Sequence, residues 1–275
     1  MKLSVINTGF FKLDGGAMFG VVPKTIWNKL NPADERNLCT WAMRCLLIED
    51  GNRLILIDNG IGDKQSPEFF RHYYLHGNDT LIGSIEKAGY SLSDVTDMFL
   101  THLHFDHCGG GVKKDGSLLF PNATYWSNTS HWKWATEPNA REKASFFREN
   151  MMPMKDSGHL KFIEKDGRSP ISQFEILHVN GHTEQMMLPL IRYKDRTIAY
   201  MADLIPSSGH IPVPYVMGYD TRPLLSIEEK DKFLKEAVAN DYILFFEHDP
   251  VVECCTVQQT EKGVRLDKTF TLSEL

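Results

Sequence analysis

Residues 101–110, THLHFDHCGG, place three histidines and one aspartate within six positions and follow them with two glycines. Imidazole and carboxylate groups cost free energy in an apolar setting unless their polar atoms have partners. The stretch alone cannot supply partners for four such side chains. A metal ion is the partner that this mixture of nitrogen and oxygen donors favours.

The spacing within the stretch separates its members into two pairs. His102 and His104 are two residues apart, so at the end of a strand their side chains point to the same side and one ion can take both. Asp106 and His107 follow after the chain turns and face another direction. Residues 109–111 are all glycine and let the backbone pass tightly beneath the site. The stretch therefore predicts two ions rather than one.

Other candidate ligands follow short apolar runs that are typical of buried strands. The runs are RLILI (53–57), DMFLT (97–101), FEILHV (174–179), TIAYM (197–201) and YILFF (242–246). The residues at or just after their ends are, in the same order, Asp58, His102, His182, Asp203 and His248. Since sites in α/β proteins form at one edge of a sheet, we expect these side chains to converge.

A two-ion arrangement assigns every candidate ligand. One ion would take His102, His104 and His182, the other would take Asp106, His107 and His248, and Asp203 would bridge them. A catalytic zinc site keeps a position open for water, whose pKa on such ions falls to about 7. That water supplies a nucleophile without any serine or cysteine. Zinc is the favoured metal, and manganese, iron and cobalt accept the same donors.

Strand runs that alternate with helical patterns predict an α/β protein. One helix is expected over about 227–239, with Ser226 and Glu229 as a capping box, and another over roughly 80–89. The stretch 121–170 is rich in Trp, Met, Phe and charge, and is expected to be a helical or loop insertion.

Length and composition restrict the class of protein. The 275 residues, 42% of them hydrophobic, fit a single domain over 1–275. The net charge of -6 leaves no basic stripe for nucleic acid, and no apolar run approaches the 18 or so residues of a membrane helix. Five cysteines without C-x-x-C spacing are expected as free thiols, Cys108 among them as a structural thiol. We expect a cytoplasmic protein.

The motif THLHFDHCGG resembles the H-x-H-x-D-H signature of the metallo-beta-lactamase-fold hydrolases. GHT at 181–183, the aspartate of ADL at 202–204 and the histidine of EHD at 247–249 continue the resemblance in the same order. It implies a four-layer αββα sandwich with the metals at one edge of two packed sheets. It also implies that Asp58, in LIDNG, orients the site.

Two further segments resemble one branch of that family. DGGAMFGVVPK (14–24) and PSSGHIPVPYVMGYD (206–220) are similar to segments of quorum-quenching N-acyl-homoserine lactonases and methyl-parathion-hydrolase-like enzymes. The resemblance implies a hydrolase in which a metal-bridging hydroxide opens a lactone or ester. His104 argues against the flavodiiron branch, which has a glutamate at this position. Asp203 argues against the true zinc β-lactamases, which usually lack an equivalent of this bridging aspartate. A glyoxalase II-like thioester hydrolase, a phosphotriesterase and a non-catalytic metal-dependent ligand-binding protein remain alternatives.

Several residues are candidates for roles beyond ligation. Asp106 could shuttle a proton, and Tyr215, Tyr219 and His210 could donate a hydrogen bond to the oxyanion. Aromatic and methionine side chains could form an apolar wall, namely Met18, Phe19, Trp27, Trp126, Trp132, Trp134, Phe146 and Phe147. A homodimer interface or a second small core is the alternative for that set. The remaining histidines are expected as surface or core residues, namely His72, His76, His131, His159 and His178.

Overall fold

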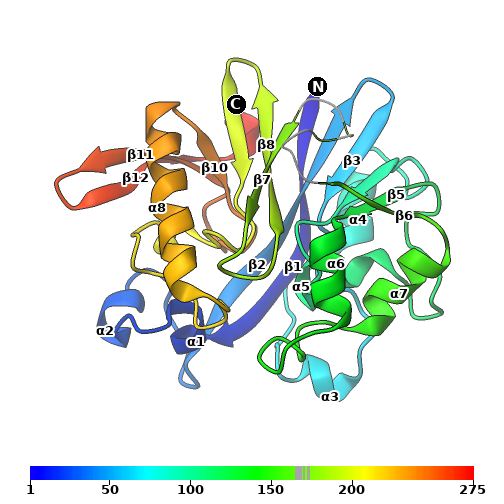
Figure 1. Cartoon of the computed structure of the whole chain (residues 1–275), viewed down its shortest axis with the longest axis horizontal. Helices are drawn as coiled ribbons and strands as arrows, with labels where there is room; N and C mark the ends of the chain where they lie inside the picture. The colour runs from blue at the N-terminus through cyan, green and yellow to red at the C-terminus, as the bar shows by residue number, and fades with distance from the viewer. Residues whose placement is uncertain (165–168, 170, 172–173) are drawn as a thin grey trace.

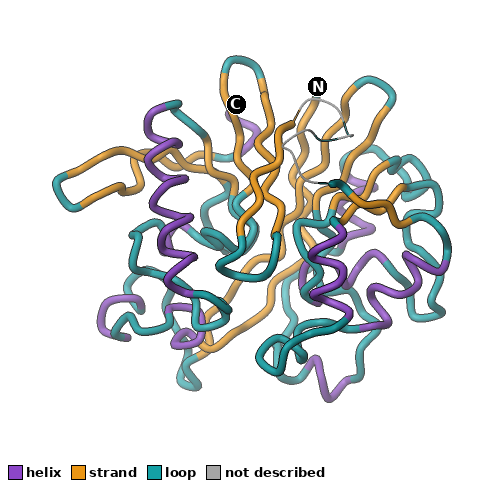
Figure 2. Tube along the Cα trace, in the orientation of Figure 1, coloured by secondary structure: helices purple, strands orange, loops and turns teal. Residues whose placement is uncertain are grey.

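The computed structural model describes residues 1–164, 169, 171 and 174–275. Two six-stranded sheets pack face to face, and helices cover their outer faces (Figures 1 and 2). This arrangement confirms the α/β class and the αββα sandwich. No helix among the described residues is long and apolar enough to cross a membrane.

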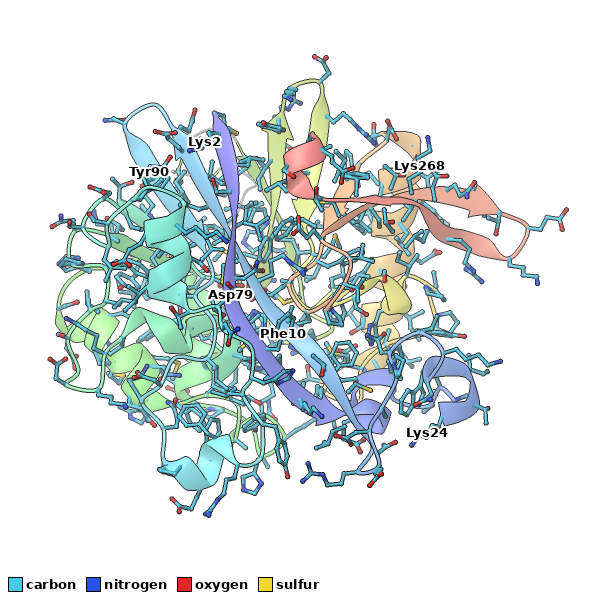
Figure 3. The ribbon with its side chains drawn as sticks, turned by 180° about the vertical axis from the view of Figure 1, so that it is seen from behind. Lys2, Phe10, Lys24, Asp79, Tyr90 and Lys268 are labelled. Carbon is cyan, nitrogen blue, oxygen red and sulfur yellow. The ribbon has the colours of Figure 1, made fainter. Side chains whose placement is uncertain are left out.

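The first sheet has its strands in sequence order. They are β1 (Lys2–Asp14), β2 (Leu38–Asp50), β3 (Arg53–Ile57), β4 (Asp97–Phe99), β5 (Thr124–Ser127) and β6 (Leu160–Phe162). The pairs β1–β2 and β2–β3 are antiparallel, and the pairs from β3 to β6 are parallel. Seen from behind, β1 and β2 run across the molecule, with Lys2 near one end of β1 and Phe10 farther along it (Figure 3).

The second sheet completes the sandwich. Its order is β12 (Gly263–Phe270), β11 (Cys254–Thr260), β10 (Ile243–Phe245), β9 (Arg196–Tyr200), β8 (Met186–Tyr193) and β7 (Phe174–Val179). The β9–β10 pair is parallel and the other four pairs are antiparallel. Of the predicted strands, 53–57 and 174–179 have the predicted bounds, and the other three agree within two residues.

The helices differ in length and position. They are α1 (Gly15–Phe19), α2 (Lys24–Trp27), α3 (Pro67–Phe70), α4 (Leu81–Lys87), α5 (Phe105–Cys108), α6 (Thr129–Thr136), α7 (Arg148–Asp156) and α8 (Pro223–Ala239), with 3-10 turns at Gly109–Gly111, Ser208–His210 and Leu272–Glu274. Apolar residues of α4, α6 and α7 pack on the first sheet. Phe233 and Leu234 of α8 pack on the second.

Strand β3 shows why its sequence is apolar from Leu54 to Ile57. Ile55 and Ile57 point into the core between the sheets, whereas Leu54 and Leu56 point to the core beneath the outer helices. Successive side chains of a strand face opposite sides, so a strand covered on both faces needs apolar residues at every position. This packing holds the end of β3, and Asp58 after it, rigidly in the interior.

Two local expectations need correction. Helix α8 begins at Pro223, so the capping box of Ser226 and Glu229 is wrong. Proline at the first helical position already starts the helix, and Ser226 lies buried inside it. The stretch 121–170 contains α6 and α7 but also supplies β5 and β6 to the first sheet.

Candidate metal centre

The ends of several strands deliver the predicted ligands to one place. His102 and His104 lie on the extended segment between β4 and α5, and Asp106 and His107 lie in α5. His182, Asp203 and His248 follow β7, β9 and β10 respectively. The structure therefore brings all seven predicted residues together, from both sheets.

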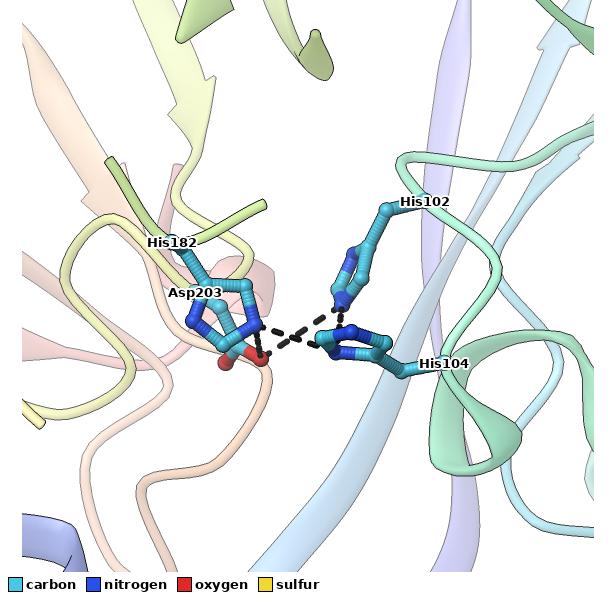
Figure 4. A group of neighbouring side chains, drawn as sticks. All are labelled: His102, His104, His182 and Asp203. Atoms are coloured by element: carbon cyan, nitrogen blue, oxygen red, sulfur yellow. Dashed lines mark hydrogen bonds and ion pairs between the residues drawn. The ribbon is translucent and has the colours of Figure 1, made fainter. Parts of the chain in front are cut away.

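The first group consists of His102, His104, His182 and Asp203 (Figure 4). Nδ1 of His104 lies 3.1 Å from Nε2 of His102 and 3.1 Å from Nε2 of His182. Oδ2 of Asp203 lies 3.0 Å from Nε2 of His182. One potential ligand atom from each residue falls within 4.8 Å of the others. All four side chains are buried.

The second group consists of Asp106, His107 and His248. Nε2 of His107 and Nε2 of His248 are 3.2 Å apart, and Oδ2 of Asp106 is 3.8 Å from each. Asp203 joins the two groups, with Oδ2 at 3.3 Å from His107 Nε2 and Oδ1 at 3.2 Å from His248 Nε2. Asp203 thus stands where the sequence predicted a bridging carboxylate.

The outer ring nitrogens of these histidines face hydrogen-bond acceptors. The contacts are His182 Nδ1 with Asp220 Oδ1 (2.9 Å), His248 Nδ1 with the Ala42 carbonyl (2.8 Å) and His104 Nε2 with Glu142 Oε1 (3.3 Å). An acceptor at the outer nitrogen holds the proton there, so the inner nitrogen presents a lone pair. Inner nitrogens 3.1 Å apart need either a proton or a metal ion between them.

Asp203 supports the same conclusion, because its buried Oδ1 faces His248 Nε2 at 3.2 Å and has no other partner among the described residues. A buried carboxylate is costly unless protons or cations on the facing groups satisfy it. The donor set mixes imidazole nitrogen with carboxylate oxygen, which divalent metals such as zinc accept. These residues fit a metal site.

Asp58 orients two of the candidate ligands. The Thr101 hydroxyl donates to Asp58 Oδ2 at 2.6 Å and lies 3.1 Å from His102 Nδ1, from which it can accept a hydrogen bond. Asp58 Oδ2 also lies 3.1 Å from Nδ1 of His107. Asp58 has a φ of 56°, in the left-handed region where aspartate is enriched. This residue therefore holds the position that the resemblance implied.

Without ions, the charges of the site act on one another. Burial alone would lower the pKa values of His182 and His248, but the Asp203 carboxylate outweighs it and raises them to about 10 and about 9. Burial alone would raise the pKa of Asp203, yet the facing imidazoles bring it well below its usual range. Burial lowers the pKa of His102. Cations bound here would displace the protons on His182 and His248.

A cavity of about 340 Å³ opens onto the two groups. Its floor includes His104, Asp106, His182, Asp203 and His248. Its walls are mainly apolar or aromatic, formed by Leu13, Met18, Tyr73, Phe105, Ala144, Met217 and Tyr219, with Arg141, Glu142 and Ser145 as polar members. Of the predicted apolar wall, Met18 lines this cavity. Phe19 and Trp27 instead stack on each other in a buried cluster.

Of the predicted oxyanion donors, Tyr219 lines the cavity and the other two do not. The prediction for His210 is wrong. Its ring is fully buried, with Nδ1 at 2.8 Å from the Ser207 hydroxyl and Nε2 at 2.9 Å from the Met18 carbonyl. Both nitrogens are thus occupied away from the cavity. Tyr215 packs against the same buried cluster as Phe19.

Several residues of the site were missed. Glu142, Asp220 and Glu247 back candidate ligands, and Tyr73 lines the cavity. Asp220 ends the 206–220 segment and Glu247 precedes His248, so both had a local signal. His131 is a core residue as expected, whose Nε2 accepts a hydrogen bond from the backbone of Leu103 at 2.9 Å. The five cysteines are buried and free.

The family model of the metallo-beta-lactamase superfamily matches residues 44–248. The chain belongs to this superfamily. An N-acyl homoserine lactonase of a Bacillus species is 24% identical over 235 residues, which cover 80% of this chain and 85% of the relative. A probable metallo-hydrolase of Mycobacterium tuberculosis is 25% identical over 230 residues, covering 74% of this chain and 70% of the relative.

Two solved structures show the same fold. A probable metal-dependent hydrolase from Staphylococcus aureus superposes with a TM-score of 0.90 at 28% identity, covering 100% of this chain and 98% of that one. AidC, a dizinc quorum-quenching lactonase in complex with the product N-hexanoyl-L-homoserine, gives a TM-score of 0.81 at 24% identity, with 98% and 95% coverage. As a member of the metallo-beta-lactamase superfamily, this chain is a hydrolase.

Proposed function

We propose that this superfamily member is a two-metal hydrolase that opens lactones or related esters, with N-acyl-homoserine lactones as the first class to test. The observation that carries the proposal is the position of Asp203, which lies against both ligand groups at the floor of one cavity. His102, His104 and His182 would hold one ion, and Asp106, His107 and His248 the other. Zinc is the proposed metal.

When bound, the pair of cations would supply an activated water and Lewis acidity for ester hydrolysis. Asp106 is the carboxylate of the second group that lines the cavity, and its side chain is 13% exposed. One of its oxygens would stay free after ligation. It would accept the proton from the attacking water and pass it to the leaving group.

Tyrosine hydroxyls on the wall would stabilise charge on the substrate. Tyr219 and Tyr73 both line the cavity. Burial, with the charge of Asp106, raises the pKa of Tyr73 to about 12, and Tyr219 is partly exposed, where a tyrosine hydroxyl is ordinarily protonated at pH 7. Both therefore remain hydrogen-bond donors at neutral pH, as an oxyanion requires.

The wall also suits an acylated substrate. Leu13, Met18, Phe105 and Met217 give an apolar surface for a short acyl chain. Ser145 places a polar residue on the same wall, where an amide would need a partner. A lactone with an amide-linked acyl group matches both features.

The experiment is a substrate panel with the zinc-loaded protein. N-acyl-homoserine lactones of different chain lengths are compared with S-lactoylglutathione and a phosphotriester. We expect lactone opening that chelation abolishes and zinc restores. Preferred turnover of the thioester or the phosphotriester would contradict the lactonase proposal. Tight binding of a lactone that is recovered unchanged would indicate a ligand-binding protein instead.

A further inference from the structure

A second carboxylate lies behind His107. Glu247 follows β10, immediately before His248, and is fully buried. Its Oε2 lies 3.1 Å from Nδ1 of His107, the same nitrogen that Asp58 Oδ2 approaches to 3.1 Å. Asp58, His107 and Glu247 form a third close group of potential ligand atoms within 4.8 Å.

The two carboxylates differ in their other partners. Asp58 accepts hydrogen bonds from the backbone and the hydroxyl of Thr101 at 2.8 and 2.6 Å. Glu247 faces the ring of His107 and the hydroxyl of Tyr200, and among the described residues no lysine or arginine is found in an ion pair with it. Nδ1 of His107 carries one proton and cannot satisfy both carboxylates. The buried carboxylates of Glu247 and Asp58 therefore share one proton of His107, and an added positive charge on that ring would stabilise both.

Backbone contacts hold Glu247 in this position. Its carbonyl accepts a hydrogen bond from the backbone of Arg44 at 3.0 Å, and the next residue, His248, accepts one from Ala42 through its own carbonyl at 3.0 Å. Arg44 is buried, but its guanidinium donates to the carbonyls of Phe246 and Val252 at 2.7 and 3.3 Å. The carboxylate is thus held behind His107. A cation bound to Nε2 of His107, on the opposite side of the ring, would supply the positive charge that complements it.

We propose that Glu247 is a positioning residue of the second metal site: together with Asp58 it fixes the ring of His107 and strengthens cation binding by Asp106, His107 and His248. This inference rests on the two-ion site of the proposed function. A carboxylate on the outer nitrogen raises the basicity of a ligating imidazole. Since Glu247 contacts His107 and none of His102, His104 and His182, its effect falls on the second ion.

The test measures metal binding rather than turnover. Full-length E247Q keeps the shape of the side chain and removes its charge, and zinc affinity is measured by competition with a chromophoric chelator together with elemental analysis. We expect the first ion to bind as in the wild type and the second to bind 10- to 100-fold more weakly. E253Q is the matched control, because the Glu253 carboxylate accepts from the Leu272 backbone, outside the site.

Cobalt loading gives a second readout, since the visible spectrum reports the geometry of each site. E247Q is expected to change the band that appears with the second equivalent and to leave the first unchanged. E247D, which keeps the charge, should recover part of the affinity, which also separates the effect from misfolding. Unchanged affinity and spectrum in E247Q would overturn the inference. Three ions per wild-type chain would also overturn it, because Glu247 would then be a ligand.

The two proposals can fail separately. If the wild-type protein binds two ions but hydrolyses nothing on the panel, the proposed function is refuted, while the role of Glu247 in metal binding can still be measured. If the wild-type protein opens lactones but E247Q binds both ions as tightly as the wild type, the proposed function stands and the inference on Glu247 is refuted.

Discussion

The carboxylate of Asp220 lies 2.9 Å from Nδ1 of His182, although the two residues are 38 positions apart. Both side chains are buried. The contact determines which nitrogen of His182 faces the other candidate ligands, since the nitrogen that donates to Asp220 cannot also present a lone pair. A residue outside the ligand set thus orients one of its members.

Replacing Asp220 tests this orientation. D220A leaves His182 free to rotate, so we expect a 10- to 100-fold loss in kcat/KM and in affinity for the first ion. D220N retains an acceptor oxygen and should lose less. The measurements are lactone kinetics and zinc competition. Equal loss in both variants would mean that the charge of Asp220, rather than its hydrogen bond, matters.

Loading the metal-free protein with zinc should release protons. The pKa values of His182 and His248 are raised to about 10 and about 9, so both rings carry an extra proton at pH 7 in the metal-free protein. Ligation requires the neutral ring. Zinc affinity should therefore rise with pH from 7 towards these values and then level off. Calorimetry in buffers of different ionisation enthalpy measures the protons released, and zero release at pH 7 would contradict the prediction.

Tyr219 and Tyr215 form a matched pair, because one lines the cavity and the other does not. If the Tyr219 hydroxyl donates to the oxyanion, Y219F should lower kcat by about 100-fold or more while KM changes little. Y215F should stay near the wild-type value. Steady-state kinetics on the best lactone decide between them. Equal rates for the two variants would mean that another residue donates the hydrogen bond to the oxyanion.

Lys230, buried in α8, holds the loop that carries the cavity wall. Its ammonium donates to the carbonyls of His210, Pro212 and Tyr215 at 2.9, 3.2 and 2.7 Å. K230M would leave these carbonyls without their donor, and one buried unsatisfied group costs about 1–3 kcal/mol. We expect a loss of at least that size in the free energy of unfolding.

Urea unfolding of the metal-free protein measures the effect, with K232M as the control on the same helix. KM should rise in K230M as well, because Met217 and Tyr219 continue the loop. Unchanged stability in K230M would show that water replaces the lysine.

Much of the site could be predicted from the sequence because its signals are local. The residue types and spacing of His102, His104, Asp106 and His107 lie within one short stretch. His182, Asp203 and His248 each follow an apolar run that forms a strand, and strand ends converge at a sheet edge. The αββα fold followed from the family that this stretch resembles.

Only the tertiary structure decided which residues of distant segments come into contact. Asp220 and Glu247 lie beside motifs of the site in the sequence and Glu142 does not, but no local pattern predicts which ligand each carboxylate backs. His210 and Tyr219 lie in one loop, yet one packs into the core and the other lines the cavity. The sequence by itself determined the ligand types and the strands that carry them, because hydrophobic periodicity and spacing act locally. Packing decided which polar groups meet, because that depends on how two sheets and their loops close on each other.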